Sequence, residues 1–266
     1  MYWINGEPEK DLPLTDRAIQ FGDGFFTTAR IRTGQVEHLS YHLERLVDAG
    51  ERLLFAPIDR ATLAGEMRRA AEQWTEGVLK VIISRGSGGR GYGIAGCGQP
   101  LRILSHGEAP GHYPLWRREG ITLHLSPVRL GCNPALAGIK HLNRLEQVMI
   151  RAHLERAGDA QEAVVLDSRG DIAECCSANI FWRRGGEVYT PSLAQAGVAG
   201  VMRRHIMALL ADSPYGLHLV EAPPEALSAA DEVLICNALM PLLPVNRFDG
   251  RVYQDRTLFE FLRNSC

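Results

Sequence analysis

The chain has 266 residues, a formal net charge of −2, 45% hydrophobic residues and 23% charged residues. This is an ordinary composition for a folded protein of one or two domains, and it excludes a disordered chain and a strongly basic nucleic-acid-binding protein. No segment approaches the roughly 18 apolar residues of a membrane span, and the N-terminus lacks the pattern of a signal peptide. We therefore expect a cytoplasmic protein that binds neither nucleic acid nor membranes.

Hydrophobic periodicity and turn residues predict the elements of the N-terminal part in chain order. A strand over 24–34 is followed by helices over 40–55 and 59–74 and by strands over 77–86 and 101–107. Ser40 and Asp59 are the expected N-caps of the two helices. Residues 87–100 contain seven glycines or prolines and predict a mobile loop between the last two strands.

Residues 108–118 contain two prolines and a glycine and show no clear periodicity, which indicates a linker at 108–120. It would separate a smaller N-terminal α/β domain, residues 1–107, from a larger C-terminal domain, residues 121–266, which carries Lys140. The C-terminal domain should contain a strand over 120–130, a helix ending near Ala157, three strands across 162–191, a helix over 198–212, a strand leading into a bend across 231–245 and a helix over 257–264. Most strands follow one another without an intervening helix, which favours an α+β fold.

The cysteines and histidines show no metal-ligand spacing. The six cysteines contain no C-x-x-C pair, and the nine histidines form no H-E-x-x-H motif. We therefore expect free thiols in a reducing compartment and no metal site.

Lys140 is the first candidate for chemistry, because it lies between the apolar residues Ile139 and Leu142 just before a predicted helix. A lysine in apolar surroundings has a lowered pKa and becomes a nucleophile toward carbonyl carbons. From this segment alone, an inert surface lysine is the more ordinary interpretation.

Three further features are each weak alone. Glu174, in "AECCSANIF", could keep a ring nitrogen protonated, or simply cap a turn or pair with a cation. Gly200, in "GVAGVMRRHI", could open a helix whose N–H groups bind an anion, although many helices begin this way. Arg45, in "HLERL", could bind phosphate or be a solvated helix arginine. An aldehyde for the lysine, a ring nitrogen for the carboxylate and a phosphate together describe pyridoxal 5′-phosphate.

These residues lie in a series of motifs that resembles the fold-type IV pyridoxal-phosphate enzymes, a family of branched-chain and D-amino-acid aminotransferases and aminodeoxychorismate lyases. Glu174 is followed by Cys175 and Cys176, which is more similar to the lyases than to the aminotransferases, where E-G-S is usual. The motifs cover essentially the whole chain in the family's order: "FGDGFFTT", "HLERL", "SRGSGGRG", "GIKHLNRLEQ", "AECCSANIF", "GVAGVMR" and "EVLICNALMPLLPV".

The resemblance implies a two-domain fold of the D-amino-acid aminotransferase type and a role for each matching residue. Lys140 would be the Schiff-base lysine and general base, Glu174 the carboxylate on the pyridine nitrogen, and Thr28 a candidate proton relay facing the substrate. The remaining residues expected at the cofactor are Arg45, Asn143, Ser177, Ala178, Val198, Gly200, Val201, Met202, Asn237 and Ala238.

The resemblance also implies residues for the substrate carboxylates. Arg90 and Tyr92 fall where D-amino-acid aminotransferases carry an arginine and a histidine, and the tyrosine puts amino-acid transamination in doubt. Arg30 is a third candidate, for which a salt bridge is an equally good interpretation. The implied reaction is the conversion of 4-amino-4-deoxychorismate to 4-aminobenzoate and pyruvate, a step toward folate, in a homodimer. The alternatives are an aminotransferase and a non-catalytic cofactor-binding protein. The retained Thr28 and Arg90 argue against the non-catalytic protein.

Overall fold

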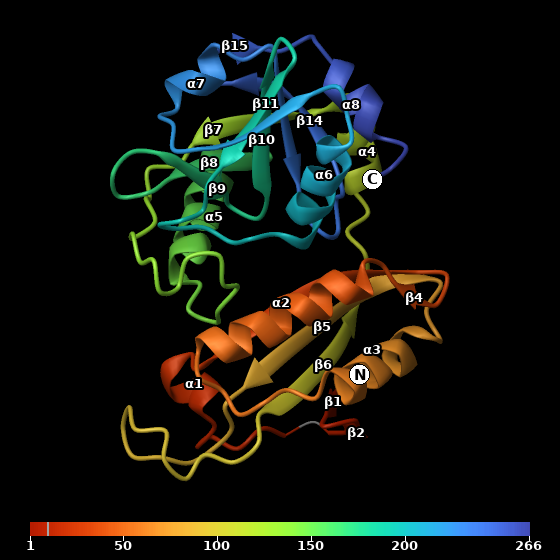
Figure 1. The fold of residues 1–266 in the computed structure, drawn as a ribbon, viewed down its shortest axis with the longest axis vertical. Helices are drawn as coiled ribbons and strands as arrows, with labels where there is room; N and C mark the ends of the chain where they lie inside the picture. The colour runs from red at the N-terminus through yellow and green to blue at the C-terminus, as the bar shows by residue number, and fades with distance from the viewer. Residues whose placement is uncertain (10) are drawn as a thin grey trace. The chain divides into compact units, whose positions relative to one another are not determined.

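The computed structural model describes residues 1–9 and 11–266. Contacts divide the chain into two compact units: unit 1 is Met1–Pro110 with Ile139–Asn143, and unit 2 is Gly111–Gly138 with Arg144–Cys266. Each unit contains a sheet and helices (Figure 1), so the expected α+β class is confirmed. No helix in the described ranges is long and apolar enough to cross a membrane.

Unit 1 is built on a six-stranded sheet in the order β2-β1-β6-β5-β3-β4, in which every neighbouring pair is antiparallel. Its strands are β1 (Tyr2–Ile4), β2 (Glu7–Pro8), β3 (Gly24–Arg32), β4 (Gln35–Val36), β5 (Glu76–Ser84) and β6 (Leu101–Gly107). Its helices are α1 (Arg17–Phe21), α2 (Leu39–Arg52) and α3 (Arg60–Ala71). Helices α2 and α3 cover one face of the sheet (Figure 1), and the core of the unit lies between them and β3 and β5.

The two predicted helix caps of unit 1 have different outcomes. Asp59 caps α3 as predicted, because its carboxylate accepts hydrogen bonds from the Ala61 and Thr62 N–H groups. The prediction of Ser40 as a cap is wrong. Helix α2 already begins at Leu39, after His38, whose left-handed backbone (φ 52°) turns the chain into the helix without a side-chain cap.

Unit 2 is built on a nine-stranded mixed sheet, ordered β12-β11-β10-β13-β14-β7-β8-β9, with β15 also paired to β14. The pairs β11–β12, β14–β7 and β7–β8 are parallel. Its strands are β7 (Ile121–Leu125), β8 (Glu162–Leu166), β9 (Ile172–Cys175), β10 (Asn179–Arg184), β11 (Glu187–Pro191), β12 (Gly216–Val220), β13 (Glu232–Cys236), β14 (Leu243–Phe248) and β15 (Arg251–Val252). Its helices are α4 (Tyr113–Glu119), α5 (Leu145–Ala157), α6 (Val201–Ala211), α7 (Glu225–Ser228) and α8 (Thr257–Leu262).

Three differences from the sequence-based expectation concern the linker, the strand that carries Glu174 and the segment that carries Lys140. The segment expected as a linker, 108–120, contains helix α4. The single strand expected between the turns at 168–171 and 184–186 is broken into β9 and β10 by a turn at Cys176–Ala178, where the Cys175 N–H donates to the Ala178 carbonyl at 2.7 Å. The segment Ile139–Asn143, expected in the C-terminal domain, belongs to unit 1.

All six cysteines are free thiols, as expected. Cys175, Cys176 and Cys236 are buried, and burial raises the pKa of Cys176 to about 12. These three side chains therefore pack as small apolar groups rather than as reactive thiolates.

Candidate active site

Lys140 is held by backbone pairing with β3 in unit 1. The Phe26 N–H donates to the Lys140 carbonyl and the Leu142 N–H donates to the Gly24 carbonyl, both at 2.9 Å. Ile139 is 3% exposed and belongs to the core of the unit. The close approach of Leu142 requires glycine at position 24, because a Cβ there would lie 2.8 Å from the Leu142 Cδ1 and 2.5 Å from the Ile83 carbonyl oxygen. The apolar neighbours noted in the sequence therefore anchor the lysine's backbone.

The Lys140 amine lies over one face of β3, with its Nζ 4.8 Å from the centroid of the Phe26 ring. Side chains alternate along a strand, so Phe26, Thr28 and Arg30 project from the same face, opposite the buried Phe25 and Ala29. The structure thus brings two residues predicted for catalysis, Lys140 and Thr28, to one face of β3.

A second lysine on this face was missed by sequence reasoning. Lys80 lies directly opposite Thr28 in the β3–β5 pairing, and its Nζ is 5.2 Å from the same Phe26 ring. Only the strand register reveals this neighbour, although the sequence gives one hint, since it contains just three lysines. Arg30, on the same face, pairs with Glu76 at 3.2 Å, which is the salt bridge that the sequence left open for it.

Arg45 lies on α2 and donates a hydrogen bond to the Thr27 hydroxyl oxygen. That hydroxyl is also 2.6 Å from the Nδ1 of His42, which is 1% exposed. Since Arg45 can only donate, the Thr27 proton must go to His42, whose Nδ1 is then an acceptor. Burial and the nearby charge of Arg45 hold the pKa of His42 well below its usual value. The result is a neutral histidine that orients Thr27 beneath the Arg45 guanidinium.

Glu174 lies on β9 in unit 2 and is 5% exposed. Its Oε2 accepts a hydrogen bond from the Val198 N–H at 2.8 Å, and its Oε1 is 3.4 Å from the Gln147 amide nitrogen. Val198 in turn forms an isolated bridge with Gly138, which precedes Lys140 by two residues. The carboxylate is thus buried, hydrogen-bonded and fixed to the segment that leads into α6.

Helix α6 begins with the arrangement of an anion site. Gly200 occupies the N-cap without a side-chain hydrogen bond, and the first turn contains no acidic residue. A Cβ at Gly200 would lie 2.0 Å from the Asn179 Oδ1, so only glycine permits this approach of the chain. The N–H groups of Val201 and Met202, in the first turn, have no acceptor within the helix and point toward its N-terminal end.

The turn that follows Glu174 is held by two side chains. The Ser177 hydroxyl donates to the Glu162 Oε1 at 2.5 Å, and the Asn237 amide donates to the Ser177 carbonyl at 3.0 Å. Asn237 also accepts hydrogen bonds from the Leu239 and Met240 N–H groups, which closes the loop that contains Ala238. Three predicted cofactor residues, Ser177, Asn237 and Ala238, thus belong to two loops that are bonded to each other.

The other predicted residues lie in loops of unit 1. Arg90 and Tyr92 are exposed in the glycine-rich segment between β5 and β6, with Tyr92 88% exposed. The Asn143 amide donates to the Gly22 carbonyl at 3.2 Å. The Asn143 side chain therefore contacts backbone, and its predicted role at the cofactor stays a prediction.

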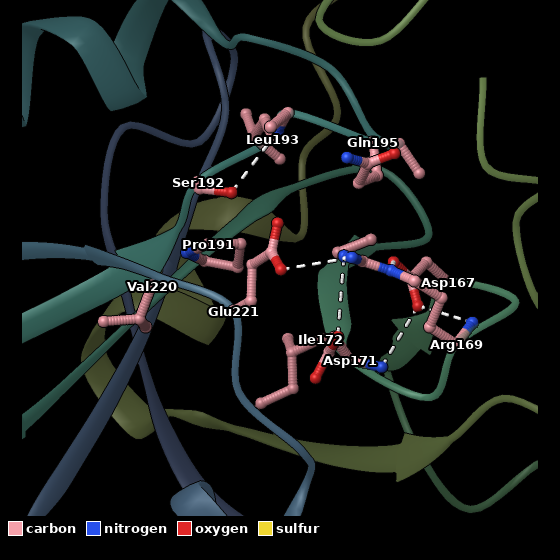
Figure 2. Close-up of a pocket in the computed structure, with 13 residues that line it drawn as sticks. Asp167, Arg169, Asp171, Ile172, Pro191, Ser192, Leu193, Gln195, Val220 and Glu221 are labelled. Atoms are coloured by element: carbon pink, nitrogen blue, oxygen red, sulfur yellow. Dashed lines mark hydrogen bonds and ion pairs between the residues drawn. The ribbon is translucent and has the colours of Figure 1, made fainter. Parts of the chain in front are cut away.

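A hollow in unit 2 involves none of the predicted residues. Figure 2 shows that Arg169 extends across it toward carboxylates from three positions, Asp167, Asp171 and Glu221. The ion-pair distances are 3.2, 3.5 and 3.1 Å. The guanidinium is therefore already paired with all three carboxylates of this cluster. Within residues 1–9 and 11–266, no group of three or more His, Cys, Asp or Glu side chains could hold a metal ion.

Comparison with known proteins identifies relatives along the whole chain. The family model for amino-transferase class IV matches residues 24–248. An aminodeoxychorismate lyase of Vibrio harveyi is 39% identical over 246 residues, covering 92% of this chain and 90% of the relative. A putative branched-chain-amino-acid aminotransferase of Methanocaldococcus jannaschii is 27% identical over 98% of this chain and 92% of its own.

Solved structures agree with these relatives. The 4-amino-4-deoxychorismate lyase of Pseudomonas aeruginosa superimposes with a TM-score of 0.93 at 35% identity, covering 99% of this chain and 98% of that chain. A branched-chain aminotransferase of Thermoproteus uzoniensis shares the fold, with a TM-score of 0.86 at 21% identity over 99% of this chain and 92% of its own. The expected fold-type IV architecture is confirmed. The chain belongs to the amino-transferase class IV family.

Proposed function

We propose that this protein is a pyridoxal-phosphate-dependent lyase that converts 4-amino-4-deoxychorismate to 4-aminobenzoate and pyruvate. The observation that carries the proposal is the position of the Lys140 amine over Phe26, on the face of β3 that also presents Thr28. This elimination needs a general base, and a hydroxyl on the same face can relay the proton that the leaving group takes up. The 39% identity with the lyase of Vibrio harveyi supports the choice of substrate.

The residues that the family resemblance assigns to pyridoxal phosphate carry groups whose chemistry suits its functional groups one by one. Lys140 supplies the amine for the aldehyde. Glu174 supplies a buried, hydrogen-bonded carboxylate for the pyridine nitrogen. Val201 and Met202, in the uncapped first turn of α6, and the Arg45 guanidinium supply N–H donors for the phosphate.

Pyridoxal phosphate would supply an aldehyde for the substrate amine and a ring that can take up electron density. Lys140 removes the proton from C4 of the substrate as general base. Glu174 would keep the pyridine nitrogen protonated, because the negative charge of its carboxylate stabilises the positive charge on that nitrogen. As the C3–O bond breaks, its electron pair leaves with the enolpyruvate, and the Thr28 hydroxyl relays the proton that this group takes up. The aromaticity of the 4-aminobenzoate ring drives the elimination.

The substrate is a dicarboxylate, which calls for cations near the reacting face. We assign Arg90 and Tyr92 to one carboxylate. Arg30 is engaged with Glu76 and serves the substrate only if that pair opens. Lys80, opposite Thr28, adds a cation that stands on the same face as the reacting groups.

The sharpest test replaces the anchor lysine. Lys140→Ala should abolish both the visible absorbance of the bound cofactor and the formation of 4-aminobenzoate from 4-amino-4-deoxychorismate made in situ. Lys80→Ala is the matched control, because it removes the other lysine near Phe26 and should keep the cofactor absorbance. A yellow, active Lys140→Ala protein would refute the proposal. Efficient turnover of a D- or branched-chain amino acid with 2-oxoglutarate, without 4-aminobenzoate formation, would establish the aminotransferase alternative instead.

The family resemblance also supports a cytoplasmic homodimer. Light scattering during gel filtration should then give twice the 29.4 kDa of the chain. A particle of 29.4 kDa at working enzyme concentrations would contradict the dimer.

A further inference from the structure

Arg17 is a buried cation that none of the assigned roles uses. It is the first residue of α1 and is 4% exposed. Its Nε donates to the Asp23 Oδ2 at 2.8 Å. The same oxygen accepts from the Arg85 Nε at 2.8 Å, and although burial raises the pKa of Asp23, the two guanidiniums outweigh it and lower that pKa. One end of Arg17 is therefore fixed to a carboxylate that stays charged.

The other end of Arg17 binds the glycine-rich loop. Its Nη1 donates to the carbonyls of Gly91 at 2.9 Å, Gly93 at 3.2 Å and Gly88 at 3.4 Å. Gly91 lies between Arg90 and Tyr92, and Gly93 follows Tyr92 directly. One guanidinium nitrogen thus ties down the backbone on both sides of each exposed side chain.

Phe21 extends this support to Tyr92. The Arg17 Cζ lies 4.9 Å above the Phe21 ring, and the centroids of the Phe21 and Tyr92 rings are 5.6 Å apart. The cation, the two rings and the loop backbone form one contiguous set of contacts.

We propose that Arg17 is a positioning residue, which fixes residues 88–93 so that Arg90 and Tyr92 are presented to a carboxylate of the substrate. The part that concerns the substrate rests on the proposed function. Arginine suits this position because its planar group offers donors in two directions and is always charged. A lysine ammonium is a point charge on a flexible stem and cannot reach Asp23 and the three carbonyls in the same geometry.

If Arg17 only stabilised the fold, its loss would unfold unit 1. If Arg17 positions the loop, its loss should release the loop alone. The carbonyls that Arg17 binds belong to an exposed loop, so water replaces its hydrogen bonds when it is lost. Asp23 keeps its bond to Arg85. Loss of Arg17 should therefore release the loop while the sheet and helices of unit 1 persist.

Limited digestion with trypsin measures the mobility of the loop directly, because Arg90 is an exposed cleavage site within it. Arg17→Lys and Arg17→Gln should be cut after Arg90 at least about tenfold faster than the wild-type protein, as measured by mass spectrometry of the fragments. Asp23→Asn, which keeps Arg17 but weakens its anchor, should give an intermediate rate. Arg60→Gln, which removes an exposed arginine of α3, should match the wild type.

Steady-state kinetics of the same holoenzymes then tests the positioning role. The two Arg17 variants should raise KM for 4-amino-4-deoxychorismate about tenfold, with kcat within about threefold and the cofactor absorbance unchanged. Wild-type cleavage rates, or faster cleavage with an unchanged KM, would overturn the proposal. If the wild-type protein forms no 4-aminobenzoate, the proposed function fails, and faster cleavage after Arg90 still supports the hold of Arg17 on the loop.

Discussion

At the scale of single residues, His42 is a buried group whose protonation affects the stability of the protein, although it takes no part in the reaction. Its Nδ1 accepts the Thr27 proton, and its Nε2 has no hydrogen-bond partner within the described part of the chain. Protonation would place a second donor against Thr27 and a second cation beside Arg45. The folded protein therefore requires His42 to be neutral.

This requirement predicts a pH dependence of stability. Because burial holds the pKa of His42 well below its ordinary value of 6.5, the unfolded chain binds up to one more proton than the folded protein at pH values between the two pKa values. The contribution of His42 to the free energy of unfolding is fully present above pH 6.5. The free energy of unfolding should fall as the pH is lowered toward the depressed pKa, with a slope approaching about 1.4 kcal/mol per pH unit. Urea unfolding at several pH values measures this slope.

His42→Asn should remove that part of the slope, since the asparagine oxygen can accept from Thr27 but does not titrate. His153→Asn, at an exposed position on α5, is the matched control and should keep the wild-type slope. Identical slopes in the wild type and His42→Asn would show that His42 does not titrate on unfolding.

At the scale of elements, the N-terminus of α6 depends on the absence of a side chain at Gly200. A methyl group there would collide with Asn179, whose amide holds the Val198 carbonyl at 2.8 Å. Gly200→Ala should therefore displace the first turn of α6 and raise the dissociation constant of pyridoxal phosphate about tenfold. Fluorescence titration of the apoprotein measures this constant.

The phosphate provides the control for this prediction. Pyridoxal, which lacks the phosphate, should bind Gly200→Ala and the wild type with similar affinity. Gly186→Ala has open space around its Cβ and should bind both compounds as the wild type does. An equal loss of affinity for pyridoxal and pyridoxal phosphate would place the defect away from the phosphate.

At the scale of the whole molecule, each unit has its own core and its own buried ion pairs. In unit 2, Glu232 is 1% exposed and pairs with Arg183 at 3.1 Å. Its two oxygens also accept the Leu258 and Phe259 N–H groups at 2.8 Å, which caps α8. One buried carboxylate thus ties the C-terminal helix to β10 and β13.

Removing this carboxylate should destabilise unit 2. Glu232→Leu leaves Arg183 partly unpaired in a buried position and leaves the Leu258 and Phe259 N–H groups without their acceptor, which should lower the free energy of unfolding by about 3–5 kcal/mol. Glu260→Ala breaks an exposed pair with Arg263 and should cost less than about 1 kcal/mol. Denaturant unfolding followed by circular dichroism compares the two, and equal midpoints would contradict the role given to Glu232.

Much of this could be predicted from the amino-acid sequence, because it depends on residue type, local spacing and motif order. The α+β class, the Asp59 cap, the boundaries of β6 and the helix after Lys140 are local consequences of side-chain pattern and chain stereochemistry. The order of the motifs also placed the chain among its relatives, since Lys140, Glu174, Arg45 and the Gly200 helix start are informative only as a set.

Tertiary structure alone decided which residues become neighbours. The pairing of Ile139–Asn143 with β3, the place of Lys80 opposite Thr28, and the hold of Arg17 on Gly88, Gly91 and Gly93 join positions between about 50 and 120 residues apart in the chain. Local propensity carries no information on such contacts, because the strand register and the packing of the core fix them together. The sequence supplied the chemical groups. The fold determined the partner of each group, because buried backbone and charged atoms must find hydrogen-bond or ion-pair partners.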